Sequence, residues 1–354
     1  MFSMEHHEIV IVGAGPAGLT AAKILGEGGK DVLVLEKLPK DRIGDKVCAG
    51  GIFRHGLIYI PKFLLEKSCD SLTFHVNGWA TTINTVDGEP FLYTVDRLKL
   101  GQYQMAVAEK AGATISPDSS VASLDKRCRV VSLKSGKKIR YDYLIGSDGS
   151  TSVIARGLGF YNDKAVCVEW YVRGRDEFEV IIDDALGMGV GYVFPHAGYT
   201  IVGAGTMPRF MQIGQFREVF KSWCRQHEIV LGGDMKAAPI KFNYNGFRFG
   251  DIFLVGDAAS FNFTTVGEGI YQAIRSGEIA AKAIIDPTYR WKDDIEQLLI
   301  YHRLGSLMTY TYDRLPKTVR SLTLKKLFRM LSSILRMPMR DAMATHLIRM
   351  VMGS

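Results

Sequence analysis

The segment 13–18, which reads Gly-Ala-Gly-Pro-Ala-Gly, constrains the fold of this chain more than any other feature. It follows a strand-like apolar run at 9–12 and precedes a helix-like run rich in alanine and leucine. A second apolar run, 32–35, ends in Glu36. A glycine-rich turn between a strand and a helix, followed by a second strand that ends in an acid, is typical of a βαβ unit that binds a dinucleotide.

The residues of this unit have distinct expected roles. Gly13 makes the tight turn, and Gly15 lets the backbone approach a pyrophosphate. Gly18 lets the helix pack on the strand, and Glu36 can bind ribose hydroxyls. An acid at position 36 argues against a phosphate on that ribose, so FAD or NAD is favoured over NADP at this site.

A second nucleotide-type signature lies far along the chain. The apolar run 252–255 ends at Gly256 and Asp257, which predicts a carboxylate at the carboxyl edge of a strand, where open α/β sheets bind ligands. The turn 267–269 and a helix-like run through Ala283 follow. Free backbone N–H groups at such a helix start suit an oxyanion or an electron-rich ring edge. One nucleotide cofactor would therefore be held from both ends of the chain.

The length of 354 residues and the hydrophobic content of 47% fit one large or two interleaved domains. The fold class expected from the order of elements is α/β, with a Rossmann-like nucleotide-binding domain in three pieces, residues 1–58, 92–160 and 241–310. An inserted antiparallel β-sheet domain, which would take the substrate, comprises residues 59–91 and 161–240. Residues 311–354 are expected to form a helical C-terminal region.

Several classes of protein are disfavoured by composition. No window of about 18 uninterrupted apolar residues occurs, so no transmembrane helix is expected. The N-terminus runs straight into the first strand and lacks the pattern of a signal peptide. The five cysteines are scattered without a Cys-x-x-Cys pair, which fits a reducing cytosol and argues against a zinc site or a disulfide framework. A cytoplasmic location without a bound metal is expected.

The net charge of +7 is unevenly spread, because residues 314–349 are rich in Lys and Arg with apolar residues interleaved. A basic amphipathic segment of this kind can lie on an anionic membrane surface, which would make the protein peripheral at the membrane. The alternative is a helix that packs its apolar side on the domain and solvates its charges. RNA binding is disfavoured because no aromatic stacking platform accompanies the charges.

Three landmarks stand in order along the chain: the 13–18 loop with Glu36, then Asp148-Gly149, then Gly256-Asp257. Their order resembles the p-hydroxybenzoate-hydroxylase-like superfamily of FAD-dependent flavoproteins, in which FAD lies extended between two domains. The resemblance covers about residues 8–285. We expect Asp148 to close a turn at the domain junction rather than to take part in chemistry.

Two further segments are similar to one branch of this superfamily, the geranylgeranyl reductase family, which includes the digeranylgeranylglycerophospholipid reductases. Residues 45–51 read Asp-Lys-Val-Cys-Ala-Gly-Gly and are similar to the Lys-x-Cys-Gly-Gly segment of these reductases. Residues 267–271 read Gly-Glu-Gly-Ile-Tyr and, with Ser276-Gly277, are similar to their C-terminal flavin motif.

The resemblance implies a set of FAD contacts. Ala17 and its loop would hold the pyrophosphate, Arg97 would reach the phosphates, and Val121 would contribute backbone near the adenine. Asp257 would bind the ribityl or pyrophosphate region. The residues implied to hold FAD are Gly13, Gly15, Ala17, Gly18, Glu36, Cys48, Ala49, Gly51, Arg97, Val121, Asp257, Gly269 and Ile270.

The segment implied to line the substrate cavity departs from the family. The reductases commonly carry Tyr-x-Trp-x-Phe-Pro, whereas residues 190–195 read Val-Gly-Tyr-Val-Phe-Pro. Phe194 and Pro195 are retained, and Tyr192 takes the place of the tryptophan. The substrate therefore stays open among geranylgeranyl chains on archaeal-type lipids, on diphosphates and on chlorophyll-type precursors.

The activity implied by the resemblance is FAD-dependent hydrogenation of the C=C bonds of geranylgeranyl chains. Reduced flavin would deliver a hydride to one alkene carbon, and an acid would protonate the other. Cys48 and Tyr192 are the candidate catalytic proton donors. The electron donor is open among NADPH, ferredoxin and a reduced deazaflavin, since no second dinucleotide loop with βαβ context occurs.

Two other functions compete with this one. The first is an FAD-dependent monooxygenase that hydroxylates or epoxidises a hydrophobic substrate. The 44–51 loop argues against it, as does the absence of the halogenase Trp-x-Trp-x-Ile-Pro signature. The second is a flavin-binding membrane-recruitment protein without enzymatic activity.

Overall fold

The computed structural model describes residues 4–85, 89–161, 164–187, 189–262 and 268–316, together with residues 319, 322 and 326. The chain divides into two compact units, each assembled from separated pieces of sequence. The first unit consists of Met1–Lys46, Arg97–Asp163 and Lys241–Arg303. The second consists of Val47–Asp96, Lys164–Ile240 and Leu304–Ser354. Most of the basic C-terminal segment lies outside the described residues.

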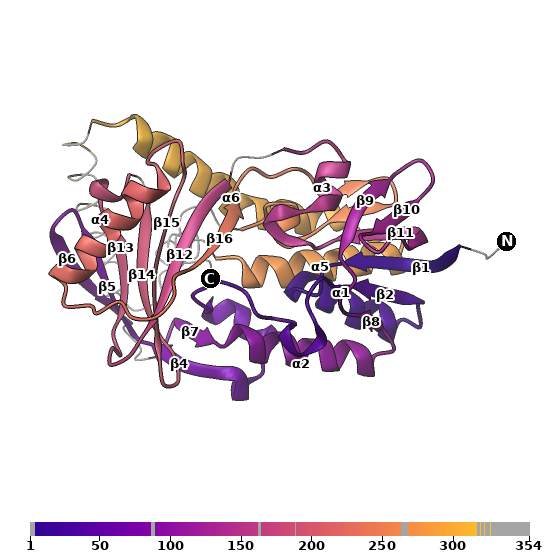
Figure 1. Cartoon of the computed structure of the whole chain (residues 1–354), viewed down its shortest axis with the longest axis horizontal. Helices are drawn as coiled ribbons and strands as arrows, with labels where there is room; N and C mark the ends of the chain where they lie inside the picture. The colour runs from indigo at the N-terminus through magenta and orange to yellow at the C-terminus, as the bar shows by residue number, and fades with distance from the viewer. Residues whose placement is uncertain are drawn as a thin grey trace. The chain divides into compact units, whose positions relative to one another are not determined.

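A mixed sheet forms the centre of the first unit, with strands in the order β17-β18-β11-β1-β2-β8 (Figure 1). The run from β18 to β8 is parallel throughout, while β17 is antiparallel to β18, and β10 and β9 extend from β11 as an antiparallel branch. The strands are β1 (Glu5–Val12), β2 (Val32–Leu35), β8 (Thr114–Ser116), β9 (Val121–Asp125), β10 (Val130–Leu133), β11 (Lys138–Gly146), β17 (Arg248–Phe249) and β18 (Ile252–Leu254).

Helices complete the first unit and close its core. Residues 9–12 and 32–35 are all buried, as expected for parallel strands covered on both faces. Helices α1 and α5 run side by side (Figure 1). The helices are α1 (Pro16–Glu27), α2 (Arg97–Lys110), α3 (Val153–Gly157), α5 (Ile270–Ile285) and α6 (Trp291–Arg314), whose last turns belong to the second unit.

The second unit is built on a sheet with strands in the order β16-β12-β15-β14-β13-β5-β6. Neighbours from β12 to β13 are antiparallel, as are β5 and β6, whereas β13 and β5 are parallel. Helix α4 (Ile213–Gln226) packs its aromatic side chains on one face of this sheet. The strands are β5 (Ser71–Val76), β6 (Trp79–Asn84), β12 (Lys164–Val172), β13 (Phe178–Ile182), β14 (Val190–Pro195), β15 (Thr200–Thr206) and β16 (Lys236–Lys241).

A smaller sheet in the second unit has the order β3-β7-β4, formed by Gly51–Phe53, Leu92–Val95 and Leu65–Cys69. These pairings explain why residues 47–58 and 92–96 group with the second unit, although the sequence assigned them to the nucleotide-binding domain. Short 3₁₀ helices occur at Lys40–Arg42, Arg54–Tyr59, Lys62–Leu64, Gly149–Thr151, Asp184–Leu186 and Gly256–Ala258.

The fold class expected from the sequence is confirmed: an α/β unit with a Rossmann-like parallel core and a second, largely antiparallel sheet unit. Strand β9 and helix α6 were not predicted. In β9 only Val121 is buried, so the strand lacks an apolar alternation that could be read from sequence.

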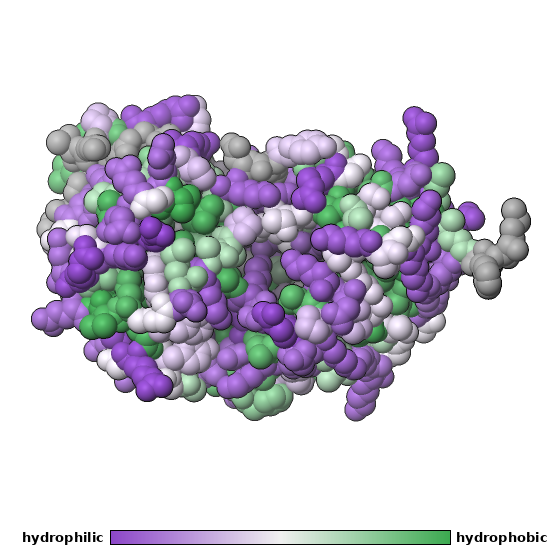
Figure 2. Space-filling view, viewed as in Figure 1, coloured by the Kyte–Doolittle hydropathy of each residue, from purple (hydrophilic) through white to green (hydrophobic). Residues whose placement is uncertain are grey.

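Figure 2 shows hydrophilic residues over much of the face in view, with hydrophobic residues in separate small patches. Exposed large hydrophobic residues include Ile58 and Tyr161, each 80% exposed. Over the part of the chain that the structure describes, no helix is long and apolar enough to cross a membrane.

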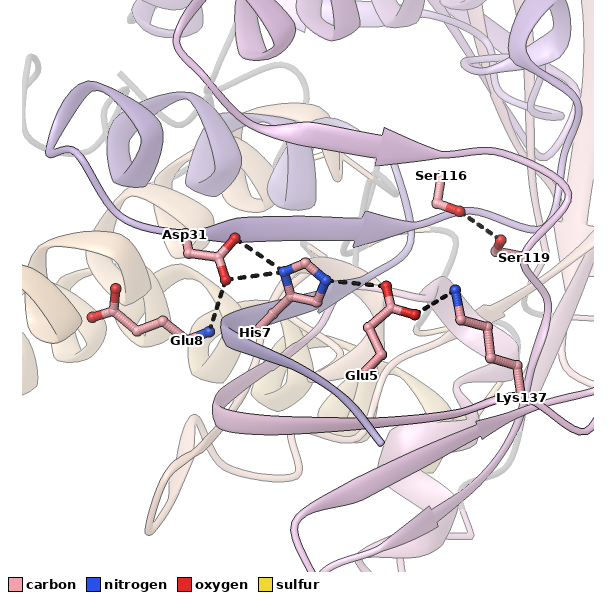
Figure 3. Close-up of polar contacts among 7 residues, drawn as sticks. All are labelled: Glu5, His7, Glu8, Asp31, Ser116, Ser119 and Lys137. Atoms are coloured by element: carbon pink, nitrogen blue, oxygen red, sulfur yellow. Dashed lines mark hydrogen bonds and ion pairs between the residues drawn. The ribbon is translucent and has the colours of Figure 1, made fainter. Parts of the chain in front are cut away.

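A charged cluster fixes the amino end of β1, away from the glycine-rich loop at its carboxyl end. Figure 3 shows the His7 ring between Asp31 and Glu5, with Nδ1 3.0 Å from an Asp31 oxygen and Nε2 3.2 Å from Glu5 Oε1. Lys137 also pairs with Glu5. Burial alone would lower the pKa of His7, but its hydrogen bonds to the two carboxylates, and their charges, outweigh burial and raise it.

We expect His7→Gln to destabilise the protein more at pH 6 than at pH 9. A raised histidine pKa in the folded state contributes stability that is complete below the unfolded value of about 6.5 and is lost as the pH rises through the folded value. The expected difference in unfolding free energy between the two pH values is about 1 kcal/mol, measurable by urea unfolding. His6→Gln, at a ring about half exposed with a single carboxylate partner, is the control. An equal effect of His7→Gln on stability at both pH values would contradict a raised pKa of His7 in the folded state.

Candidate functional site

Two glycines of the 13–18 loop are required by packing. Gly13 has a φ of +103°, and a Cβ there would lie 2.5 Å from the Ser147 carbonyl oxygen. A Cβ on Gly18 would lie 2.1 Å from the Gly13 carbonyl oxygen. The Ser147 hydroxyl lies 2.8 Å from the Val12 carbonyl oxygen and 2.7 Å from that of Gly13. The end of β11 therefore holds the turn between β1 and α1 in place.

Gly15 differs from its neighbours because it faces open space. A Cβ built on it meets no atom within 4 Å, and no side chain caps the start of α1. The first turn of α1 also lacks an acid. The start of α1, with the positive end of its helix dipole, therefore lies beside an open space at Gly15, which is the requirement for a pyrophosphate. This arrangement fits the phosphates of a dinucleotide such as FAD.

Glu36 is 7% exposed at the end of β2. Its two carboxylate oxygens accept hydrogen bonds from the backbone N–H of Ala14, at 2.7 Å, and of Leu38, at 2.9 Å. The Glu36 carbonyl oxygen accepts from Ser119 N–H at 2.7 Å, which brings the segment before Val121 to the same end of the sheet. Each carboxylate oxygen retains a lone pair, so the predicted ribose contact is compatible with these bonds.

Asp257 lies at the carboxyl end of β18, where the sequence placed it. Lys46 Nζ is 2.7 Å from Asp257 Oδ2, and the Ser150 hydroxyl is 3.2 Å from the same oxygen. Burial raises the pKa of Asp257, but the charge and hydrogen bond of Lys46, the Ser150 hydrogen bond and the charge of Arg97 together lower it. Arg97 Nε is buried without a hydrogen-bond partner among the described residues, which suits a donor awaiting a phosphate oxygen.

The C-terminal flavin motif comes together with the N-terminal loop in the first unit. The Ser276 hydroxyl accepts a hydrogen bond from Gly256 N–H at 2.9 Å. A Cβ on Gly256 would lie 3.3 Å from that of Ala17, and one on Gly269 would lie 3.6 Å from Asp257 Oδ1. Ile270 begins α5 and is 3% exposed. Predicted residues from both ends of the chain thus form one cluster.

Cys48, Ala49 and Gly51 belong to the second unit, where they form a loop held by His196. His196 is 2% exposed, with Nε2 3.0 Å from the Ala49 carbonyl oxygen and Nδ1 2.8 Å from Glu66 Oε2. Its ring stacks on Tyr199 at a centroid distance of 4.8 Å. His196 was not predicted as a site residue. Its position directly after the Phe-Pro pair is the only sequence feature that could have indicated its contact with this loop.

The predicted substrate-lining residues touch this loop. A Cβ on Gly51 would lie 2.6 Å from the Phe194 ring, so the loop backbone packs directly on that side chain. The Pro195 carbonyl oxygen accepts a hydrogen bond from the buried Thr94 hydroxyl at 2.8 Å. Phe194 also contacts Tyr192, with a ring-centroid distance of 5.7 Å. The 48–51 loop and the segment 190–195 therefore form one surface.

Tyr192 and Cys48, the candidate proton donors, interact electrostatically within this surface. The Tyr192 hydroxyl lies 2.5 Å from Glu169 Oε1 on β12. Burial first, and then the charges of Glu169, Cys167 and Cys48, raise the pKa of Tyr192 well above its usual range. Glu169 was missed from the sequence, because an isolated acid carries no sign of the strand that will face it. Lys46 belongs to the 45–51 motif, but its contact with Asp257 was not predicted.

Asp148 has a structural position. Its carboxylate accepts hydrogen bonds from Val153 N–H at 2.5 Å and from the Ser152 hydroxyl, also at 2.5 Å, at the start of α3. Burial raises the pKa of Asp148 in spite of these bonds. The Asp148-Gly149 pair closes a turn, as expected.

A cavity of about 610 Å³ lies elsewhere in the second unit, lined in part by His75, Arg175, Glu179 and His227. Glu179 pairs with Val193 across β13 and β14. Since adjacent residues on a strand point to opposite faces, Glu179 and Tyr192 lie on opposite faces of the sheet. None of the predicted site residues lines this cavity.

Comparison with known proteins places this geometry in a family context. Residues 6–49 match the family described as FAD binding domain. Geranylgeranyl diphosphate reductase from Arabidopsis thaliana chloroplasts is 27% identical, with 82% of this chain and 68% of that protein covered. Digeranylgeranylglycerophospholipid reductase from Methanosarcina acetivorans is 27% identical, with 82% of this chain and 78% of that protein covered. Over about four fifths of its length, the chain is similar to the geranylgeranyl reductases. It is a flavin-dependent oxidoreductase, and its cofactor is FAD.

The fold of this chain is also similar to the folds of solved structures. A geranylgeranyl bacteriochlorophyll reductase-like protein from Thermoplasma acidophilum matches with a TM-score of 0.80 at 20% identity, with 98% of this chain and 96% of that chain covered. A p-nitrophenol 4-monooxygenase from Pseudomonas putida matches with a TM-score of 0.73 at 17% identity, with 98% and 99% covered. Reductases and monooxygenases share this fold, so the fold by itself does not select the reaction.

Substitutions at two glycines distinguish a residue needed for FAD binding from a residue needed for stability. We expect Gly15→Ala to leave the thermal stability of the apoprotein within about 1 kcal/mol, because the added Cβ meets no protein atom, while the affinity for FAD falls by roughly tenfold because the methyl group enters the open space. Gly18→Ala should instead destabilise the protein by roughly 3 kcal/mol, since its Cβ would meet a backbone oxygen. Thermal unfolding and flavin titration measure the two effects. Full FAD affinity in Gly15→Ala would show that the pyrophosphate does not lie at this loop.

Proposed function

We propose that the protein is an FAD-dependent reductase that hydrogenates C=C bonds of a geranylgeranyl chain carried on a membrane-lipid or diphosphate precursor. The curated relatives named as geranylgeranyl diphosphate and digeranylgeranylglycerophospholipid reductases, which align with about four fifths of the chain, support this activity. The first unit would hold the cofactor, and the sheet face of the second unit would take the prenyl chain.

The cofactor site follows from the contacts of the first unit. The Gly15 opening and the start of α1 would hold the pyrophosphate, and Glu36 would hold the adenosine ribose. Arg97 would donate to a phosphate, and Asp257 would accept from a hydroxyl of the ribityl chain while Lys46 keeps it ionised. Bound FAD supplies hydride chemistry that no side chain of this protein can supply.

The observation that carries the proposal is Tyr192, a protonated phenol that lies next to the Phe194 ring on the sheet of the second unit. An isolated alkene has no carbonyl to activate it, so its reduction needs a hydride on one carbon and a proton on the other, in a site that excludes water. The Phe194 and Phe178 rings, 5.6 Å apart, give this face the apolar character that a prenyl chain requires. Tyr192, together with the Cys48 thiol, supplies the proton-bearing groups.

The competing reaction is oxygenation, which the monooxygenase of the same fold makes a specific alternative. It would use the same FAD site and an equally apolar substrate. The two reactions differ in their product, since reduction adds two hydrogens at each double bond whereas oxygenation adds an oxygen atom.

Anaerobic turnover separates the two reactions. The purified holoenzyme is screened with NADPH, reduced ferredoxin and a reduced deazaflavin until its flavin bleaches, and a geranylgeranyl lipid or geranylgeranyl diphosphate is then added without oxygen. We expect a product mass increased by two hydrogens for each double bond, measured by mass spectrometry. A product that gains oxygen, and forms only in air, would contradict the proposal.

A further inference from the structure

Three neighbouring strands of the second unit bring an acid and a phenol into line. Glu169 on β12 pairs with Gly203 on β15, and Gly203 pairs with Tyr192 on β14. Residues directly opposite one another on paired strands point to the same face. The neighbouring residues Val168, Val193 and Val202 point to the other face, where they pack in the α4 core.

Gly203 permits the contact between the two outer residues. A Cβ on Gly203 would lie 2.6 Å from the Tyr192 hydroxyl oxygen and from ring atom Cζ. The Tyr192 ring therefore lies flat across the middle strand and reaches over it to Glu169, with 2.5 Å between Tyr192 Oη and Glu169 Oε1. Any larger residue at position 203 would occupy the space of the ring.

Glu169 is 0% exposed. Placing a carboxyl group inside an apolar region costs free energy, and a sheet of this kind is already held by its backbone ladder and by the α4 core. An apolar residue would fill the position at lower cost. A buried acid in contact with a candidate proton donor is therefore better explained by chemistry than by stability.

We propose that Glu169 is the proton source and positioning residue for Tyr192 in the reduction of the alkene. This inference rests on the proposed function and adds a residue to it. Glu169 acts through Tyr192 and need not touch the substrate.

In the structure the Tyr192 hydroxyl donates to Glu169 Oε1. In the proposed relay, uptake of a proton by Glu169 reverses this hydrogen bond, which leaves the phenol hydrogen free to point toward the substrate. Bound reduced FAD would supply a hydride to one alkene carbon, while the Tyr192 proton would pass to the other carbon and the Glu169 proton would pass to the Tyr192 oxygen. The π bond would be broken and two C–H bonds formed, with the two electrons supplied by the flavin. Glu169 remains as a carboxylate that accepts from the phenol, and a solvent proton restores it.

Single-turnover kinetics test the inference. Holoenzyme is reduced without oxygen and mixed with the prenyl substrate that the wild type reduces, and reoxidation of the flavin is followed by absorbance. Glu169→Gln keeps the shape of the side chain but removes the acid, so we expect the rate to fall by roughly 100-fold while substrate affinity and FAD content stay unchanged. The rate of flavin reoxidation in Tyr192→Phe should fall by a similar factor.

Two further variants distinguish a relay from a merely structural role. The Glu169→Gln/Tyr192→Phe double variant should be no slower than the slower single variant, because both changes interrupt one path. Gly203→Ala retains both reacting side chains but displaces the ring, and it should be as slow as Glu169→Gln. Matched controls are Glu177→Gln, at an exposed carboxylate, and Gly214→Ala, whose Cβ meets no atom within 4 Å. Both controls should retain the wild-type rate.

These kinetic measurements test the role of Glu169 separately from the proposed function. If the wild type reoxidises its flavin with a prenyl substrate and Glu169→Gln does so within twofold of that rate, the inference is wrong although the function stands. Additive losses in the double variant would likewise overturn the relay. If no prenyl substrate reoxidises the reduced wild-type flavin, the proposed function itself fails.

Discussion

The close contact between helices α1 and α5 is the constraint on which the cofactor site depends. A Cβ on Gly277 of α5 would lie 2.1 Å from the Ala17 carbonyl oxygen in α1, so only glycine allows the two helices to approach this closely. The adjacent Ser276 holds the Gly256 turn, which carries Asp257. The contact thereby joins residues from the two ends of the chain around one loop, and it explains why a nucleotide signature is divided between them.

The second unit uses glycine in a comparable way. Gly51 admits the Phe194 ring, and Gly203 admits the Tyr192 ring, each by leaving out a side chain where an aromatic ring must cross the backbone. The result is an apolar sheet face with one buried acid and phenol in contact. In both units a missing side chain creates room for a specific group, which is the physical link between the glycine content of the chain and its chemistry.

Much of this architecture could be predicted from the sequence, because it depends on residues that are close together along the chain. The strand at residues 32–35, the helix after Asp96 and the Asn77-Gly78 turn, with φ values of 46° and 74°, follow from apolar runs and turn residues. Contacts that join distant strands could not be predicted, because a single sequence does not state the register that aligns Glu169 with Gly203 and Tyr192. For the same reason, the contact between Lys46 and Asp257, which lie 211 residues apart along the chain, could not be predicted. The functional roles of the predicted FAD residues stay predictions.

In the proposed reaction, electrons from one bound FAD and a proton from the sheet face saturate a prenyl double bond. The most direct measurement is an anaerobic titration of fully reduced holoenzyme with a prenyl substrate in D₂O, with the flavin absorbance and the product mass recorded together. We expect one double bond to be saturated for each flavin that is reoxidised, with solvent deuterium incorporated at each former double bond. Reoxidation without a saturated product, or a product formed without incorporation of solvent deuterium, would contradict it.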